Sequence, residues 1–370
     1  MTLPVVAAAR GWAPLRACAR SLHGWALLVV ATALLMALPG CLMPRYLAQA
    51  SYGQFDLLRR ARPIEKAIAD PNTPSWVAEL LGEIPSIKAY GAAQGLVVKR
   101  NYTTYSALGR TAAVWFVGAA DPLQFTPRKW CFPIVGCFPG LGWFDEDDAI
   151  AHRRELEARG YDAISRPASA YSTGGWFPDP VLSTMLSSDT DGFPEFANVI
   201  LHESVHASVL VPDQPFFNES IASYVADAMT DHWVIERFGA GSPEQLAWLY
   251  GQAAREVRTA RMFAAYAELA ELYKTTKPRT EKLQVKQRII DELVEEMRLR
   301  RRPNNASLIE LRVYKAGASA LADAHRGCGD LRRMVLAARQ LRRSDFGKDL
   351  QDDLTPVVPT LIARCQAAPR

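Results

Sequence analysis

The chain has 370 residues, of which 49% are hydrophobic and 22% are charged. That length and apolar content can build one large domain or two ordinary ones, and they exclude a disordered or collagen-like chain. The 43 basic and 39 acidic residues nearly balance, and three of the basic ones lie in the first 40 residues, which hold no acid. The rest of the chain therefore has too little positive charge for a broad nucleic-acid surface, and we expect no nucleic-acid partner.

The N-terminus predicts an export signal. Basic residues precede an uncharged run over 24–40, GWALLVVATALLMALPG, and Cys41 follows. A basic start, an apolar middle and a small residue before the cut are typical of a secretory signal, and about 17 residues is short for a membrane span. The L-P-G-C stretch also resembles a bacterial lipobox, from which Pro39 departs mildly. We therefore predict a signal peptide over residues 1–40.

Cleavage at this lipobox would leave a lipid on Cys41. The protein would then be anchored in the bacterial cell envelope, and Leu42 after the cysteine implies the outer membrane, facing the periplasm. An uncleaved signal anchor and plain secretion, with Cys41 an ordinary thiol, are the alternatives.

Residues 41–370 are predicted to form a mainly α domain with a small β-sheet, an α+β fold. Expected helices fill much of 45–100, with a break at Pro63, and also cover 145–160, 194–211, 217–238, 244–302 with a break at Pro278, 304–323 and 330–343. Expected strands or extended segments cover 111–120, 163–166 and 171–177, and the residues from 127 to 145 read as a loop or hairpin rich in Pro and Gly.

Four cysteines remain once Cys18 leaves with the signal and Cys41 is acylated. An even number in an oxidising compartment permits two disulfides. Cys131 with Cys137 would close a short loop, and Cys328 with Cys365 would fasten the C-terminal tail. Four cysteines allow three connectivities, and four free thiols are the alternative.

The main chemical signal is the stretch VILHESVHASVL over residues 199–210. On a helix, His202 and His206 project from the same face, so both imidazoles can reach one metal ion. Glu203 points about 100° away from His202, where it can reach a water on that ion. The spacing predicts a zinc site, with one Zn²⁺ per chain, in a zincin-like core built around this helix.

A third ligand must come from elsewhere in the chain. Glu219 lies thirteen residues after the second histidine, in a stretch FNES where Asn218 could cap a second helix. Two histidines and a carboxylate with a fourth position open are a catalytic zinc arrangement. Asp213 in the connecting loop is the rival ligand, and Asp227 could support a histidine from behind.

These parts predict hydrolysis by a zinc-activated water, with Glu203 as the general base. An oxyanion-stabilising residue should lie nearby, and Tyr171, Tyr224 and His232 are unranked candidates. The extended segment 171–177, with Trp176 and Phe177, could pair with a peptide substrate, although packing in the core is the favoured reading.

The combination of the lipobox with AYSTGGWFPDPVLST at 170–184, LHESVH at 201–206, FNESIA at 217–222 and NNASL at 304–308 resembles a family of bacterial predicted aminopeptidases. The similarity runs over nearly all of residues 41–343. It implies His202, His206 and Glu219 as metal ligands and Glu203 as the base. Departures occur at Gly174 and Ala207, and a tyrosine expected near residues 136–138 is missing, which affects a candidate substrate wall.

The sequence thus predicts a zinc-dependent metallopeptidase of the bacterial envelope, with a peptide or protein as substrate and the membrane as a partner through the lipid. Amidase action on cell-wall peptide is a close alternative. A non-enzymatic envelope lipoprotein, whose zinc site is structural or residual, is the second class. Glu203 separates the two classes, because a structural site needs no carboxylate beside its first ligand and usually has no open position.

Overall fold

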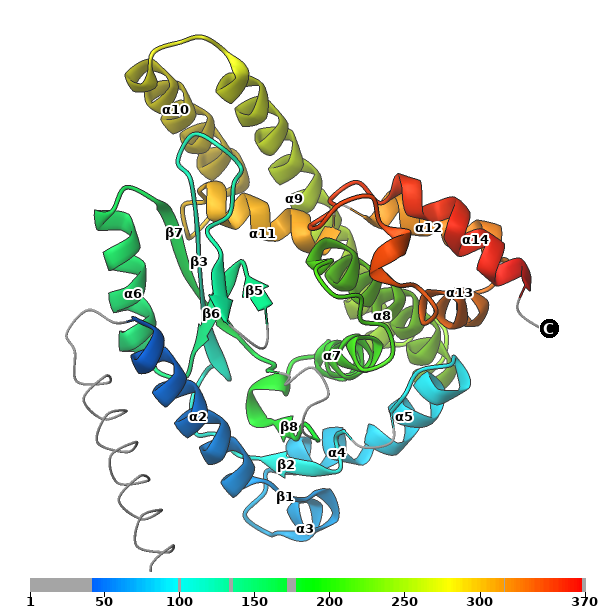
Figure 1. Cartoon of the computed structure of the whole chain (residues 1–370). Coiled ribbons are helices and arrows are strands. Elements are labelled where there is room, and N and C mark those ends of the chain that lie inside the picture. The colour runs from blue at the N-terminus through cyan, green and yellow to red at the C-terminus, as the bar shows by residue number, and fades with distance from the viewer. Residues whose placement is uncertain (1–41, 99–100, 133–135, 172–177, 316, 368–370) are drawn as a thin grey trace, which may run out of the picture. The chain divides into compact units, whose positions relative to one another are not determined.

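The computed structural model describes residues 42–98, 101–132, 136–171, 178–315 and 317–367 (Figure 1). The predicted signal peptide and Cys41 lie outside these residues, as do Trp176 and Phe177 with most of the predicted segment 171–177. The chain divides into two compact units, residues 1–53 and residues 54–370. None of the described helices is both long and apolar enough to cross a membrane.

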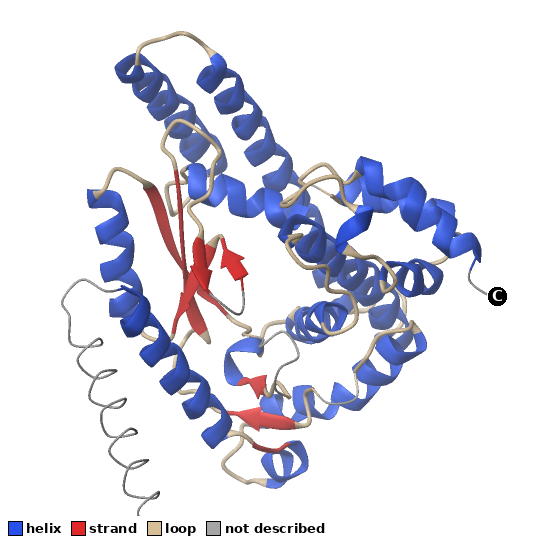
Figure 2. Cartoon of the chain, in the orientation of Figure 1, coloured by secondary structure: helices blue, strands red, loops and turns tan. Residues whose placement is uncertain are grey.

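The fold is mainly α with small β-sheets, as predicted (Figure 2). The longer helices of the described chain are α2 (Leu42–Arg60), α5 (Ile84–Ala93), α6 (Glu146–Ala158), α7 (Gly192–His206), α8 (Pro215–Phe238), α9 (Pro243–Lys274), α10 (Arg279–Met297), α11 (Asn305–Lys315), α12 (Ala318–Cys328) and α14 (Val358–Ala367). The shorter ones are α3 (Ile64–Ala69), α4 (Ser75–Gly82) and α13 (Leu331–Ala338).

Three small sheets accompany these helices. The largest has the antiparallel order β6-β3-β7, with strands Gly140–Trp143, Val114–Ala120 and Asp162–Ala168. A second sheet has the order β1-β2-β8 (Arg62–Pro63, Thr104–Ser106, Val181–Leu182), and the third is the hairpin of β4 (Trp130–Phe132) and β5 (Gly136–Phe138). The predictions of a strand at 111–120 and a hairpin within 127–145 are confirmed.

Local sequence signals set several helix ends. The Asp145 side chain accepts the Asp148 N–H at the start of α6, and Gly160, with φ of +84°, follows its end. Pro278 separates α9 from α10, as predicted, because it cannot continue a helix. Figure 1 shows these two helices as a hairpin joined by a short connection.

The helices near the C-terminus differ from the prediction in two respects. The helix expected over 304–323 is two helices, α11 and α12, separated near Gly317. A Cβ on Gly317 would lie 2.3 Å from the Leu354 side chain and 2.9 Å from that of Ser220, so the chain turns where it packs tightly against α8. Helix α14 was not predicted at all.

Two disulfides are present in the described chain. One joins Cys131 to Cys137 across the β4–β5 hairpin, and the other joins Cys328 on α12 to Cys365 on α14. They are the pairs that the sequence suggested first, and the second holds the C-terminal helix in the core.

Candidate metal centre

Helix α7 passes through the main hydrophobic core. Ile200, Leu201, Ser204 and Val205 are buried on its inner face, and Ser204 Oγ donates to the carbonyl of Ile200. The opposite face therefore presents the histidine side chains, which are 17% exposed at His202 and 15% exposed at His206. The sequence places the two imidazoles one turn apart, and burial of the other face fixes their direction.

The side chains of His202, His206 and Glu219 converge on one point. The two Nε2 atoms lie 3.1 Å apart, and Oε2 of Glu219, on the first turns of α8, lies 3.5 and 3.4 Å from them. A tetrahedral zinc ion with ligand distances of 2.0–2.1 Å separates its ligand atoms by about 3.3 Å. These three residues therefore fit such an ion, and no other group of this kind occurs among the residues the structure describes.

The charges within this cluster support one another. Burial disfavours ionisation of Glu219, but contacts with both imidazoles outweigh it and hold the pKa of its carboxyl below the usual range. Burial likewise disfavours the charged form of His206, but the Glu219 carboxylate outweighs burial and raises the pKa of the imidazole. The Glu219 side chain is therefore ionised between the two imidazoles. A carboxyl group must be ionised to bind a metal ion.

Glu203 lies beside the cluster rather than in it. Burial raises the pKa of its carboxyl, and the negative charges of Glu219 and Asp179 add to that effect, while the two histidines oppose it. The carboxyl is therefore a better proton acceptor than an ordinary glutamate near neutral pH.

Tyr102 and Asp179 are two neighbours of Glu203 that sequence reasoning missed. Both are buried, the Tyr102 N–H donates to the Asp179 carbonyl, and Tyr102 has a positive φ of 60°. Burial and the charge of Glu203 raise the pKa of the Tyr102 phenol. No local pattern marks Tyr102, whereas Asp179 belongs to the stretch 170–184 that carries the family resemblance.

The segment between the helices differs from the prediction. Helix α7 ends at His206 rather than near residue 211, and α8 begins at Pro215, so Asn218 is not its N-cap. Asn218 is instead buried, its Oδ1 accepting the Val211 N–H and its Nδ2 donating to the Val211 carbonyl. This pair of bonds fastens the connecting loop one residue before Glu219.

Other predicted site residues lie elsewhere. Asp213 is exposed in the loop and does not join the cluster, so it is not the third ligand. Tyr224 hydroxyl lies 3.0 Å from Nδ1 of His325, and His232 is exposed about 20 Å along α8 from Glu219. Neither is placed to stabilise an oxyanion at the cluster.

Two further candidates stay predictions. Oδ1 of Asp227 accepts a hydrogen bond from Asn198, one turn before His202 on α7. The Tyr171 ring packs edge-on against Phe144, with ring centroids 5.2 Å apart. Neither contact tests the role that the sequence suggested.

A cavity of about 300 Å³ adjoins the cluster, with His206 and Glu219 in its wall. Its remaining wall is mostly apolar and comes from β3, the turn between β5 and β6, and α11. Phe138, in the region where a tyrosine was expected, is part of this wall. The NNASL stretch lies at the start of α11, so it positions one side of the cavity.

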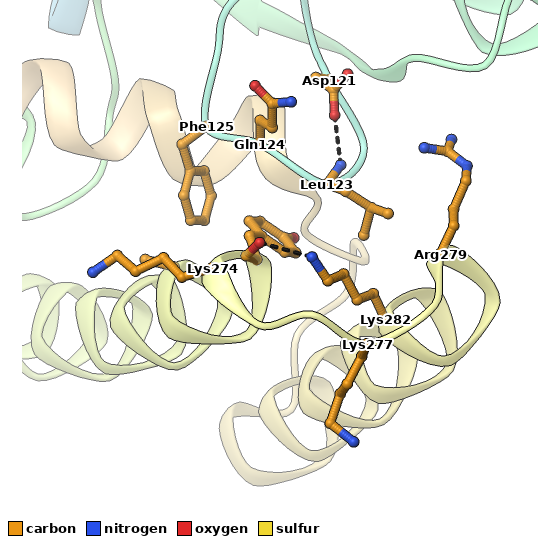
Figure 3. Close-up of a pocket in the computed structure, with 10 residues that line it drawn as sticks. Asp121, Leu123, Gln124, Phe125, Lys274, Lys277, Arg279 and Lys282 are labelled. Carbon is orange, nitrogen blue, oxygen red and sulfur yellow. Dashed lines mark hydrogen bonds between the residues drawn. The ribbon is translucent and has the colours of Figure 1, made fainter.

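A separate pocket of about 550 Å³ lies at the end of the α9–α10 hairpin (Figure 3). Its three lysines have partners: Lys274 pairs with Glu271, Lys277 with Glu281, and Lys282 Nζ donates to the carbonyl of Tyr273. Figure 3 shows the Lys274 and Lys277 side chains pointing in different directions rather than toward one ligand. The lysines of this pocket therefore do not form a common binding point, in contrast to the side chains of the α7–α8 cluster.

A buried helix that presents two histidines to a carboxylate on the next helix defines a candidate metal-dependent site. The chain belongs to the protein family described as "Putative aminopeptidase", whose model matches residues 45–349. No curated protein and no solved structure matches it. The match covers every residue of the cluster and extends well beyond it, and at this coarse level the family name supports a hydrolase.

Proposed function

We propose that the protein is a zinc-dependent metallopeptidase. One observation carries the proposal: three ligand atoms, from His202, His206 and Glu219, have the mutual spacing of a tetrahedral ion's ligands, beside the half-buried side chain of Glu203. The family description supports the same reaction class. Partial exposure of all three ligands supports an open fourth position, as in a catalytic site.

His202, His206 and Glu219 would hold the zinc ion, which would supply a water of lowered pKa and a positive charge that polarises a carbonyl oxygen. Glu203 would accept a proton from that water while the water oxygen attacks the carbonyl carbon of the peptide. The same carboxyl then gives the proton to the amine nitrogen as the C–N bond breaks. Its raised pKa suits both transfers.

We also place this reaction in the bacterial envelope, with the chain held at the outer membrane by a lipid on Cys41. The lipobox-like L-P-G-C stretch supports this placement. The two disulfides add support, because such bonds persist in the periplasm and are rare in the cytosol.

Metal analysis of residues 42–370, exported without the lipid, tests the proposal together with two variants. Wild-type protein and Glu203→Gln should each hold one zinc per chain, and His202→Ala should lose it. On a library of quenched fluorescent peptides, Glu203→Gln should lower kcat by at least about 100-fold, because general base catalysis contributes 10²–10⁴-fold.

The outcomes separate the two functional classes. Zinc binding without hydrolysis of any peptide would favour the non-enzymatic lipoprotein with a structural zinc. Full activity in Glu203→Gln would refute the role of that carboxyl while leaving the metal site intact. Absence of zinc from wild-type protein would overturn the site itself.

A further inference from the structure

Among the residues that the structure describes, the wall of the cavity beside the cluster offers almost no polar side chain to a ligand. Apart from the metal-site residues, its polar wall groups are Asn218, which is bonded to Val211, and Glu310, which is paired with Arg166. The other side chains of the wall are apolar, including Ile309 and Val313 of α11. Burying an apolar group in this cavity would strengthen the binding of a ligand, and burying a charged group there would weaken it.

Two exposed apolar side chains extend this surface outward. Phe138 is 41% exposed and Leu210 is 59% exposed, and both belong to the wall of the cavity. Phe138 directly follows Cys137, whose disulfide to Cys131 ties the strands of the hairpin together. The rim of the cavity is therefore apolar, and the disulfide restrains the hairpin that carries Phe138. Both properties suit a site for a hydrophobic group.

Phe116 on β3 sets one wall of the cavity, and glycines make room for its ring. A Cβ on Gly140 would lie 2.1 Å from the ring, and one on Gly118 would lie 2.9 Å from it. The guanidinium of Arg166 stands 5.2 Å from the ring centroid and is held by its pair with Glu310. The ring is therefore confined between the sheet and the arginine, where it limits the depth of the cavity.

We infer that this cavity binds a bulky apolar side chain of the peptide, of leucine or phenylalanine size, on a residue that flanks the scissile bond. The inference rests on the proposed function, because His206 and Glu219 form part of the wall and so place the side chain next to the metal. Phe116 determines how large that side chain can be, and Leu210 contributes to its entrance.

The first test needs no catalysis. Protein treated with EDTA is mixed with acetyl-leucine amide or acetyl-glutamine amide, and saturation-transfer NMR reports binding. The leucine methyl groups should receive saturation in wild-type protein and at least about 5-fold less in Leu210→Glu, because a charge at an apolar entrance is costly. Leu246→Glu on α9 is the matched control, since Leu246 is also exposed, at 45%, but is not in the cavity wall.

The second test uses quenched peptides that differ only in the residues next to the cleavage point. Wild-type protein should prefer Leu or Phe over Ala or Glu at one of them by about 10-fold or more in kcat/KM. Phe116→Ala should move the preference toward larger side chains, Phe and Trp, and Leu210→Glu should abolish it while cleavage of the Ala peptide persists.

The results distinguish failure of this inference from failure of the proposed function. Equal cleavage of all peptides, unchanged by Leu210→Glu, would overturn the apolar subsite while the peptidase assignment stands. Binding of acetyl-leucine amide without cleavage of any peptide would overturn the peptidase assignment and leave the apolar cavity as a binding site. Equal saturation of the leucine and glutamine amides would contradict the inference directly.

Discussion

Two clusters of polar side chains in the folded unit behave differently. At the candidate metal centre, Nε2 of His202, Nε2 of His206 and Oε2 of Glu219 meet at 3.1–3.5 Å, and all three atoms are acceptors when both imidazoles are neutral with the proton on Nδ1, the tautomer that binds a metal through Nε2. Near the end of α9 that joins α10, by contrast, every contact of the second cluster pairs a donor with an acceptor.

Asn305 is the centre of this second cluster. It is fully buried, its N–H donates to Asp162, its side-chain amide donates to the carbonyl of Asp121, and its Oδ1 accepts the Tyr273 hydroxyl. Lys286 Nζ also donates to Asp162. Such a satisfied network holds elements together by itself, whereas three converging acceptor atoms are stabilised by a shared proton or by a bound metal cation.

The largest expected effect is the response of stability to zinc. Free zinc at 1,000 times its Kd should stabilise wild-type protein by about 4 kcal/mol, because only the folded chain gathers the three ligands. His206→Ala should lose that increment. Urea unfolding with zinc and with EDTA measures it, and an equal midpoint in both conditions for wild-type protein would contradict the comparison.

The second cluster should contribute stability that does not depend on zinc. Asn305→Ala removes partners from the Tyr273 hydroxyl and the Asp121 carbonyl, which should cost about 1–3 kcal/mol. The variant should keep the full zinc increment. Asn72→Ala is the matched control, since Asn72 is exposed and its removal should change stability by no more than about 0.5 kcal/mol. If the zinc response disappeared in Asn305→Ala, the two clusters would not contribute to stability independently, which would contradict the comparison.

Sequence reasoning grouped His202, His206 and Glu219 because helical geometry brings these three side chains together. His202 and His206 are one turn apart, and Glu219 follows within one short loop, so local spacing brings them together. Tyr102 and Asp179 approach Glu203 from distant parts of the chain, and no periodicity reports such a contact.

The same distinction explains the errors in the helices. Strand β3 and helix α6 carry their own apolar or capping signals, and the sequence predicted both. The separation of α11 from α12 depends on how closely Gly317 approaches Ser220 and Leu354. Asn218 was assigned to a cap from its position, whereas tertiary contacts direct it to Val211. Contacts between distant segments decide these features.

The smallest expected effect is the loss, at alkaline pH, of the stability that the Tyr273 hydroxyl contributes to the second cluster. Burial raises the pKa of the Tyr273 hydroxyl, and the bond to Asn305 only partly offsets it. The unfolded chain therefore ionises first, near pH 10, and the stabilisation from this tyrosine, complete below that pH, is lost as pH rises toward the folded pKa.

Tyr273→Phe should cost about 1 kcal/mol at pH 7. Because each pH unit above 10 removes up to about 1.4 kcal/mol from wild-type protein alone, the gap should close by about pH 11. Urea unfolding of both proteins from pH 7 to about pH 11 measures this. Tyr250→Phe, at a ring that is 75% exposed, should follow wild-type protein throughout. A gap that stays constant across pH 10 would show that the hydroxyl is free to ionise in the fold, and the second cluster would then be less tightly satisfied than its hydrogen bonds indicate.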